Sequence, residues 1–174
     1  MISKKITLTL TLTIAALTFC SFAAEPAKNW IRNGSFEKTP GANGQVDNWS
    51  IPKTMQIVPG GKDGKQYLEG KGTTSTWTLA MKAGKTYKLS FWIKKGGNWL
   101  GVTIYGVDSK KKQVKAKDLQ VYYKTPVKDW TLQEMTFTLP ADFKHGRVIF
   151  STHGGVISLD GVTLTEVTTA PAAK

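Results

Sequence analysis

The sequence predicts an all-β protein, an antiparallel β-sandwich of the jelly-roll type, on three observations. Apolar and polar residues alternate with a period of two in several short segments, turn-forming residues separate these segments, and no segment carries an apolar repeat of 3.6 residues over helical length. Many short strands with closely spaced turns and no helices are typical of domains in which two antiparallel sheets pack face to face.

The clearest predicted strand spans residues 85–94. Its apolar face is formed by Tyr87, Leu89, Phe91 and Ile93, and its opposite face by Lys88, Ser90, Trp92 and Lys94. Alternate side chains of a strand point to opposite sides of a sheet, so this pattern predicts a half-buried strand. It also places the indole of Trp92 on the polar, outward side.

The same alternation predicts the remaining strands. They are expected at 65–70, 100–105, 131–139, 147–152 and 157–167. Turn signals rich in Gly, Pro, Asn and Asp separate them, at 40–44, 59–61, 63–64, 96–98 and 153–155.

The first residues have the composition of an export signal. Lys4 and Lys5 form a positive segment, and the apolar stretch 6–19 is too short to span a bilayer as a helix. Small residues at Ser21 and Ala23 suit cleavage after Ala23. We therefore expect a signal peptide at 1–23, one domain at 24–167, a disordered tail at 168–174, and a protein that is secreted, periplasmic or held at the cell surface.

Cys20 is the only cysteine, and it would leave with the signal peptide. A lipoprotein is the alternative, although Phe19 stands where lipoprotein processing requires a small residue. The mature chain then has no disulfide, no cysteine nucleophile and no cysteine zinc site. We expect a monomer without a transmembrane segment, stabilised by its hydrophobic core.

The charge is strongly positive. The formal net charge is +12, and removing Lys4 and Lys5 leaves 12 − 2 = +10. This sign favours an anionic partner such as an acidic polysaccharide or a cell envelope. The lysines at 110–112, with Lys115 and Lys117, are either a solvated loop or an anion contact. The predicted export argues against a nucleic-acid partner.

Five motifs resemble those of CenC-type carbohydrate-binding modules. They are the segment 29–37 (NWIRNGSFE), which resembles the family's opening strand, Trp49 after a loop, the segment 84–94 (GKTYKLSFWIK), the segment 130–139, and the closing segment 157–164 (ISLDGVTL). The resemblance extends from about Asn29 to Val167 and implies a galactose-binding-like jelly roll. One departure is Gly161, where the family usually has a second aspartate.

The resemblance implies a structural calcium ion held by Glu37 and Asp160, which match the family's motif positions near the two ends of the domain. Calcium requires several hard oxygen ligands, and an ion there would tie the terminal strands together. The alternative is that Glu37 pairs with a lysine and Asp160 caps a turn.

Sugar binding on this type of fold uses aromatic rings that stack on a pyranose. Our candidates are out of phase with the core face or lie at turns: Trp92, Trp99, Tyr105 and Tyr122, with Lys88 and Lys94 beside Trp92. Trp92 is the first choice, because Lys88, Ser90 and Lys94 flank it on the same face. A lysine beside a ring would suit a uronic acid or a sulfated sugar. Each ring could instead only cover a loop. The aromatic residues predicted for the core are Trp30, Phe36, Trp49, Phe91, Phe137 and Phe150.

Catalytic machinery is not evident. A glycosidase needs two carboxyl groups facing each other across the sugar, whereas the neighbours of Glu134 on its face of the predicted strand 131–139 are Thr136 and Thr138. His145 and His153 lie in turn-rich stretches without a nucleophile elbow. We therefore predict a non-catalytic protein that binds a polysaccharide or oligosaccharide. The alternatives are an envelope structural or adhesion protein that contacts protein or peptidoglycan, and a small jelly-roll glycoside hydrolase or polysaccharide lyase.

Overall fold

The computed structural model describes residues 27–38, 46–94, 99–110, 112–114, 119–123 and 128–168. The side chains of Tyr123 and His153 are not part of this description. The predicted signal peptide at 1–23, Cys20, and the tail beyond Thr168 lie outside the described residues. Within the described part of the chain, no helix has the length and hydropathy needed to cross a membrane.

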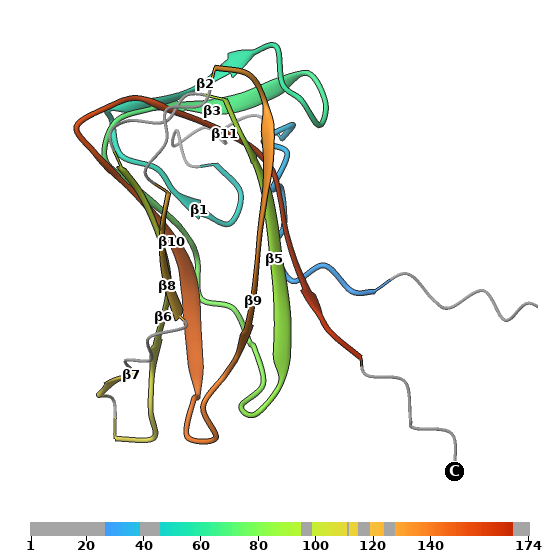
Figure 1. The fold of residues 1–174 in the computed structure, drawn as a ribbon, viewed down its shortest axis with the longest axis vertical. Coiled ribbons are helices and arrows are strands. Elements are labelled where there is room, and N and C mark those ends of the chain that lie inside the picture. Colours follow the sequence, from blue (N-terminus) through green and yellow to red (C-terminus); the bar gives the residue numbers. More distant parts are fainter. Residues whose placement is uncertain are drawn as a thin grey trace, which may run out of the picture.

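The structure is a sandwich of two antiparallel sheets, as predicted (Figure 1). We call the six-stranded sheet the front sheet; it has the order β1-β4-β10-β6-β7, and β8 also pairs with β6. Its strands are β1 (Trp49–Ser50), β4 (Thr73–Thr76), β6 (Trp99–Val107), β7 (Gln113–Val114), β8 (Gln120–Tyr123) and β10 (His145–His153).

The five-stranded sheet, which we call the back sheet, has the order β2-β3-β11-β5-β9. Its strands are β2 (Met55–Pro59), β3 (Gln66–Gly70), β5 (Thr86–Ile93), β9 (Thr131–Thr138) and β11 (Ile157–Glu166). Figure 1 shows β5 and β9 on one side of the sandwich and β6, β8 and β10 on the other. The two sheets therefore have separate outer faces.

The core lies between the sheets and contains the residues that the period-two pattern assigned to it. Tyr87, Leu89, Phe91 and Ile93 of β5 are all buried. Phe91 meets Phe150 of the front sheet edge to face, with ring centroids 5.1 Å apart. Full burial of a large apolar side chain contributes about 1.5–3 kcal/mol. The core therefore joins the two sheets across the whole sandwich.

Five of the six aromatic residues predicted for the core are buried, namely Phe36, Trp49, Phe91, Phe137 and Phe150. Trp30 is only half-buried. Its ring packs edge-on against Tyr87, with a centroid distance of 6.1 Å. The difference arises because Trp30 lies at the edge of the back sheet, where Asn29 forms an isolated bridge with Thr165.

The opening segment 29–37 is a turn rather than the strand implied by the resemblance. Backbone φ is positive at Asn33 and Phe36, at 50° and 57°. Gly34 approaches β11 so closely that an added Cβ would lie 1.9 Å from the carbonyl oxygen of Val162. Beyond the isolated bridge at Asn29, the segment therefore turns to insert Phe36 into the core and forms no strand.

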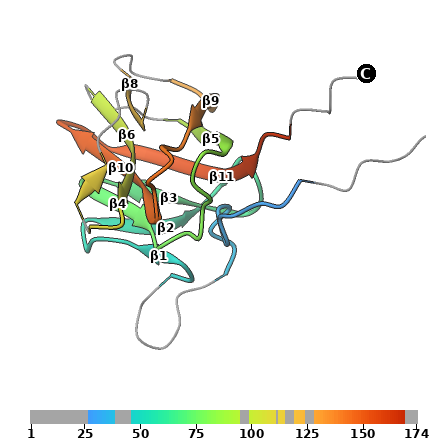
Figure 2. The same cartoon turned by 90° about the horizontal axis from the view of Figure 1, so that it is seen from below.

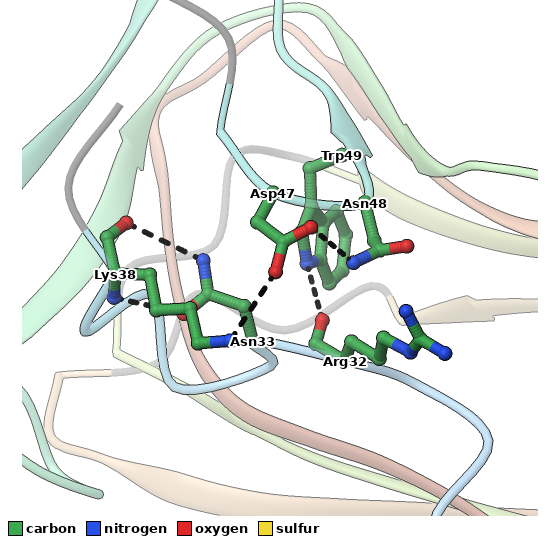
Figure 3. A network of polar contacts seen from close by, with 6 residues as sticks. All are labelled: Arg32, Asn33, Lys38, Asp47, Asn48 and Trp49. Carbon is green, nitrogen blue, oxygen red and sulfur yellow. Dashed lines mark hydrogen bonds and ion pairs between the residues drawn. The ribbon is translucent and has the colours of Figure 1, made fainter. Parts of the chain in front are cut away.

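A polar network holds this turn (Figure 3). The Asn33 side chain accepts a hydrogen bond from the backbone N–H of Lys38 at 3.0 Å. The Lys38 ammonium forms an ion pair with Asp47 at 3.5 Å. The indole Nε1 of Trp49 donates to the carbonyl of Arg32 at 3.3 Å, so the buried ring has a partner for its polar atom.

Strand β4 was missed because its sequence, Thr-Thr-Ser-Thr, has no apolar alternation. Its buried hydroxyl groups have partners instead. Thr74 donates to the carbonyl of Ser50 at 3.0 Å, and Thr76 accepts from the backbone N–H of Val148 at 3.0 Å. Short strands β1, β2, β7 and β8 also escaped sequence prediction.

The beginning of the described chain and the end of β11 lie side by side in both views (Figures 1 and 2). The backbone N–H of Trp30 donates to the carbonyl of Leu164 at 2.8 Å, and the Asn29 side chain accepts from the N–H of Leu164 at 3.0 Å. The two ends of the domain are thus tied by hydrogen bonds.

Candidate functional site

The candidate ligand-binding residues divide between the two outer faces. Trp99 and Tyr105 on β6 and Tyr122 on β8 lie on the outer face of the front sheet. Trp92, Lys88 and Lys94 belong to the back sheet or its margin. Because the core separates these faces, the two groups cannot contact one sugar ring together.

The register of the front sheet brings aromatic and polar side chains onto one surface. Gly101 is opposite both Tyr122 and Ser151, Thr103 is opposite both Gln120 and Ile149, and Tyr105 is opposite Arg147. We call this outer surface the platform. Its members are Thr73, Ser75, Trp99, Gly101, Thr103, Tyr105, Gln120, Tyr122, Arg147, Ile149 and Ser151.

Trp99 and Tyr122 form the most exposed aromatic pair of the platform. Their side chains are 39% and 53% exposed, and their rings meet edge to face with centroids 6.4 Å apart. Tyr122 lies over Gly101, since an added Cβ there would be 3.3 Å from its Cε1 atom. The glycine therefore leaves room for the tyrosine ring against the sheet.

Tyr105 and Arg147 form a second pair further along the platform. The guanidinium carbon of Arg147 lies 5.4 Å from the centroid of the Tyr105 ring, within the range of a cation–π contact. Beside them is a hollow of about 250 Å³, which we call the Tyr105 hollow. It is lined by Thr78, Tyr105, Val107, His145, Gly146 and Arg147.

Trp77 is an exposed aromatic residue that sequence reasoning missed. It follows β4 directly, is 48% exposed, and its backbone N–H donates to the carbonyl of Asn48 at 2.8 Å. It lines a cleft of about 350 Å³ with Lys28, Trp30 and Arg32 among others. The Thr-rich stretch before it showed no strand pattern, so no face could be assigned to it.

On the back sheet, Trp92 is half-buried and already in contact with its own chain. The Lys62 ammonium lies 5.0 Å from the centroid of its ring. Gly161, at φ 55°, sits so close that an added Cβ would lie 2.9 Å from Trp92 Cδ1. This contact is a physical reason for a glycine where the family usually has an aspartate.

The two lysines beside Trp92 also have partners. Lys88 forms an ion pair with Glu134 of the neighbouring strand at 2.8 Å, and both side chains are 44% exposed. The Lys94 ammonium lies 5.9 Å from the centroid of Trp130. Trp130 in turn meets Tyr67 edge to face at 5.2 Å. These charges and rings therefore interact within the back sheet.

Asp160 is fully buried and holds the loop between β2 and β3. Its Oδ2 accepts backbone N–H bonds from Lys62 at 2.6 Å and Asp63 at 2.7 Å, and its Oδ1 accepts from Gly161 at 2.7 Å. Burial raises the pKa of the Asp160 carboxyl above its ordinary value, against the lowering effect of these three donors. The bonds agree with the alternative in which this aspartate caps a turn.

Glu37 holds the same loop from the other side. Its Oε1 accepts backbone N–H bonds from Lys65 at 2.7 Å and Gln66 at 2.8 Å. Gly64 lies against it, with an added Cβ 2.6 Å from Oε1. We call Glu37, Asp160 and the residues 61–66 between them the loop clamp.

The loop clamp fits calcium poorly. Calcium takes six to eight oxygen ligands, whereas these two carboxylates face five backbone N–H donors. Among the described residues, no three His, Cys, Asp or Glu side chains are grouped closely enough to hold a metal ion. The structure shows a hydrogen-bonded clamp, and calcium at Glu37 and Asp160 stays a prediction.

An antiparallel β-sandwich that presents aromatic rings and neutral polar groups on the outer face of one sheet has the architecture of a carbohydrate-binding module. The sequence agrees with this class. Residues 28–157 match the family described as carbohydrate binding domain. The match covers well over half of the chain, and the protein therefore belongs to this family.

Solved structures support the fold. The CBM22-1 xylan-binding domain of Paenibacillus barcinonensis Xyn10C superposes with a TM-score of 0.61 at 17% identity, covering 85% of this chain and 100% of the domain. The structure named Family 16 Carbohydrate Binding Module-2 gives 0.59 at 25% identity, covering 79% of this chain and 100% of the other. The predicted jelly-roll sandwich is confirmed.

A third similar structure is the enzymatically active domain of tailspike protein 4 from bacteriophage CBA120. It gives a TM-score of 0.57 at 18% identity, covering 80% of this chain and 21% of that chain. The present chain thus spans about a fifth of the length of that solved chain, and the likeness shows a shared fold alone. No curated protein matches the chain at a significant level.

Proposed function

We propose that the protein is a secreted or cell-surface, non-catalytic carbohydrate-binding module of the CenC type, and that the platform is its glycan-binding surface. The observation that carries the proposal is the pairing of exposed aromatic rings with neutral hydrogen-bonding groups on the front sheet. Lys4, Lys5 and the apolar stretch 6–19 support export.

The platform has both kinds of group that a saccharide needs. Trp99 and Tyr122 offer ring faces to the apolar face of a pyranose, and each aromatic contact contributes on the order of 1 kcal/mol. Tyr105, whose ring meets the guanidinium of Arg147, lies further along β6. Thr103 and Gln120 stand opposite each other between these rings. Thr103 offers a hydroxyl to a sugar, and Gln120, whose amide nitrogen donates to the Tyr122 hydroxyl, offers its amide oxygen. The platform extends along β6, so it suits a chain of several sugars.

Binding without hydrolysis is favoured by the composition of the front sheet. None of its strands contains Asp or Glu. A glycosidase requires two carboxyl groups on opposite sides of the scissile bond. The strands beneath a sugar on the platform provide neither a general acid nor a carboxylate nucleophile.

Affinity electrophoresis in gels containing neutral or acidic polysaccharides tests the proposal. The wild-type protein should be retarded by at least one polysaccharide, and Trp99→Ala should weaken binding about tenfold, because it removes one ring and its contact with Tyr122. Trp92→Ala is the matched control on the back sheet and should change affinity less than twofold.

Three outcomes contradict the proposal. If Trp92→Ala and Trp99→Ala weaken the affinity for a polysaccharide equally, the platform is not the specific binding surface. Retardation that vanishes with salt alone and ignores both substitutions would indicate diffuse charge attraction, as expected of a general envelope protein. Reducing ends or unsaturated products released from a polysaccharide would identify an enzyme.

A further inference from the structure

The Tyr105 hollow differs from the rest of the platform because it contains ionisable nitrogen groups. Arg147 and His145 come from β10, Tyr105 from β6, and Thr78 from the stretch after β4. Its volume of about 250 Å³ is smaller than the roughly 300–1,000 Å³ typical of pockets for drug-sized ligands. It therefore suits a single sugar substituent rather than a whole oligosaccharide.

Arg147 has no carboxylate partner among the described residues. Its one described interaction is the contact with the face of Tyr105, at 5.4 Å. A guanidinium group has five N–H donors in a planar fork, and the ring contact leaves those donors available for an oxyanion. On the back sheet, by contrast, the exposed Lys88 has Glu134 as its ion-pair partner.

One acidic residue is adjacent to the hollow in sequence: Asp108 follows Val107, and its carboxylate accepts hydrogen bonds from the backbone N–H groups of Lys110 and Lys112. The strands of the front sheet contain no acidic residue, and the lining of the hollow contains none either. The whole chain carries a net charge of +12. An anion at this position would therefore meet favourable charge both locally and at longer range.

We propose that the Tyr105 hollow is an anion subsite that binds the carboxylate or sulfate group of an acidic saccharide, so that the glycan bound on the platform is an acidic polysaccharide. Arg147 donates to the oxyanion, the ring of Tyr105 holds the guanidinium in place, and His145 and Thr78 add an N–H and a hydroxyl at the rim. This inference rests on the proposed function of the platform and names its class of ligand.

The test compares two polysaccharides with one backbone and different charge. Polygalacturonate and its highly methyl-esterified form are titrated against the wild-type protein at 0.15 M salt. Dextran sulfate is titrated in the same way to test for binding of a sulfated polysaccharide. The wild type should bind an acidic form at least about tenfold more tightly than the esterified one. Binding to polygalacturonate or to dextran sulfate identifies the anion as a carboxylate or a sulfate.

Arg147→Gln should lower the affinity for the acidic ligand about tenfold and the affinity for the esterified polymer by a smaller factor, so that the preference for the acidic form decreases. Arg147→Lys keeps the positive charge but loses the planar set of N–H donors. Its affinity for the acidic ligand should lie between that of the wild type and that of Arg147→Gln. Lys53→Gln removes the same charge from an exposed residue beside β2 and should change affinity less than twofold. Unchanged melting temperatures confirm that the variants fold.

Two results would overturn the anion subsite. One is equal loss of affinity in Arg147→Gln and Lys53→Gln, which indicates diffuse attraction. The other is a wild-type protein that binds esterified and acidic polymers equally. In either case the proposed function survives if Trp99→Ala still weakens binding, and it fails separately if Trp99→Ala has no effect on any polysaccharide.

Discussion

The two outer faces of the sandwich carry similar aromatic residues but very different charges. The strands of the back sheet contain all four strand carboxylates, Glu69, Glu134, Asp160 and Glu166. The strands of the front sheet contain none. On the back sheet, lysines lie over the indoles and pair with acids, whereas the front sheet leaves Arg147 without a described acid.

This difference shows that an outward-pointing aromatic residue is not by itself a binding residue. Trp92 and Trp99 both alternate with core residues along their strands. Trp92 contacts Lys62 and Gly161, which lies where the register of β11 against β5 shifts between Asp160 and Thr163. Trp99, by contrast, is 39% exposed. We infer a back face that stabilises the fold and a front face that binds the ligand.

The largest effect that separates the two faces is expected at Asp160. Asp160→Ala removes a fully buried carboxylate that accepts three backbone N–H bonds, from Lys62, Asp63 and Gly161. We expect the free energy of unfolding to fall by about 3 kcal/mol, measured by chemical denaturation. At a temperature where the variant remains folded, its affinity for polysaccharide should match that of the wild type.

A chelator provides the companion measurement for the loop clamp. If Glu37 and Asp160 work through hydrogen bonds alone, the melting temperature of the wild type is the same with and without EDTA. A clear decrease with EDTA that added calcium reverses would support the predicted ion. Loss of polysaccharide affinity in folded Asp160→Ala would contradict the division between the two faces.

A smaller effect is expected at Gly101, beneath Tyr122. Gly101→Val places a branched side chain where an added Cβ already lies 3.3 Å from the tyrosine ring, so the ring must move. We expect about a fivefold loss of affinity, which corresponds to about 1 kcal/mol, measured by titration with the polysaccharide. Gly101→Ala should lose less, and a melting temperature that falls steeply in both variants would show that Gly101 serves stability instead.

The smallest effect is expected for the ion pair between Lys88 and Glu134. Both side chains are 44% exposed, so water screens the pair. A double-mutant cycle with Lys88→Met and Glu134→Gln should give a coupling energy of at most about 0.5 kcal/mol in unfolding. No variant of the cycle should change affinity. A loss of affinity in Lys88→Met alone would show that Lys88 contributes to ligand binding.

Much of the fold could be predicted from the sequence, because alternating apolar and polar residues indicate which side of each strand faces the core. The buried side of β5 and its outward residue Trp92 were both correctly assigned. The opening segment was not, because its path depends on the close approach of Gly34 to Val162 in a strand about 130 positions later in the chain. Trp77 was missed because a Thr-rich strand has no apolar period to set its phase.

The sequence alone determined the all-β class, the core face of the main strands and the outward direction of Trp92, since these depend on local alternation. Tertiary structure alone decided which strands share a sheet, and therefore that Trp99, Tyr105 and Tyr122 lie together while Trp92, Lys88 and Lys94 lie behind the core. The physical reason is that alternation separates inward from outward within one strand, but pairing between distant strands is set by how the whole core packs.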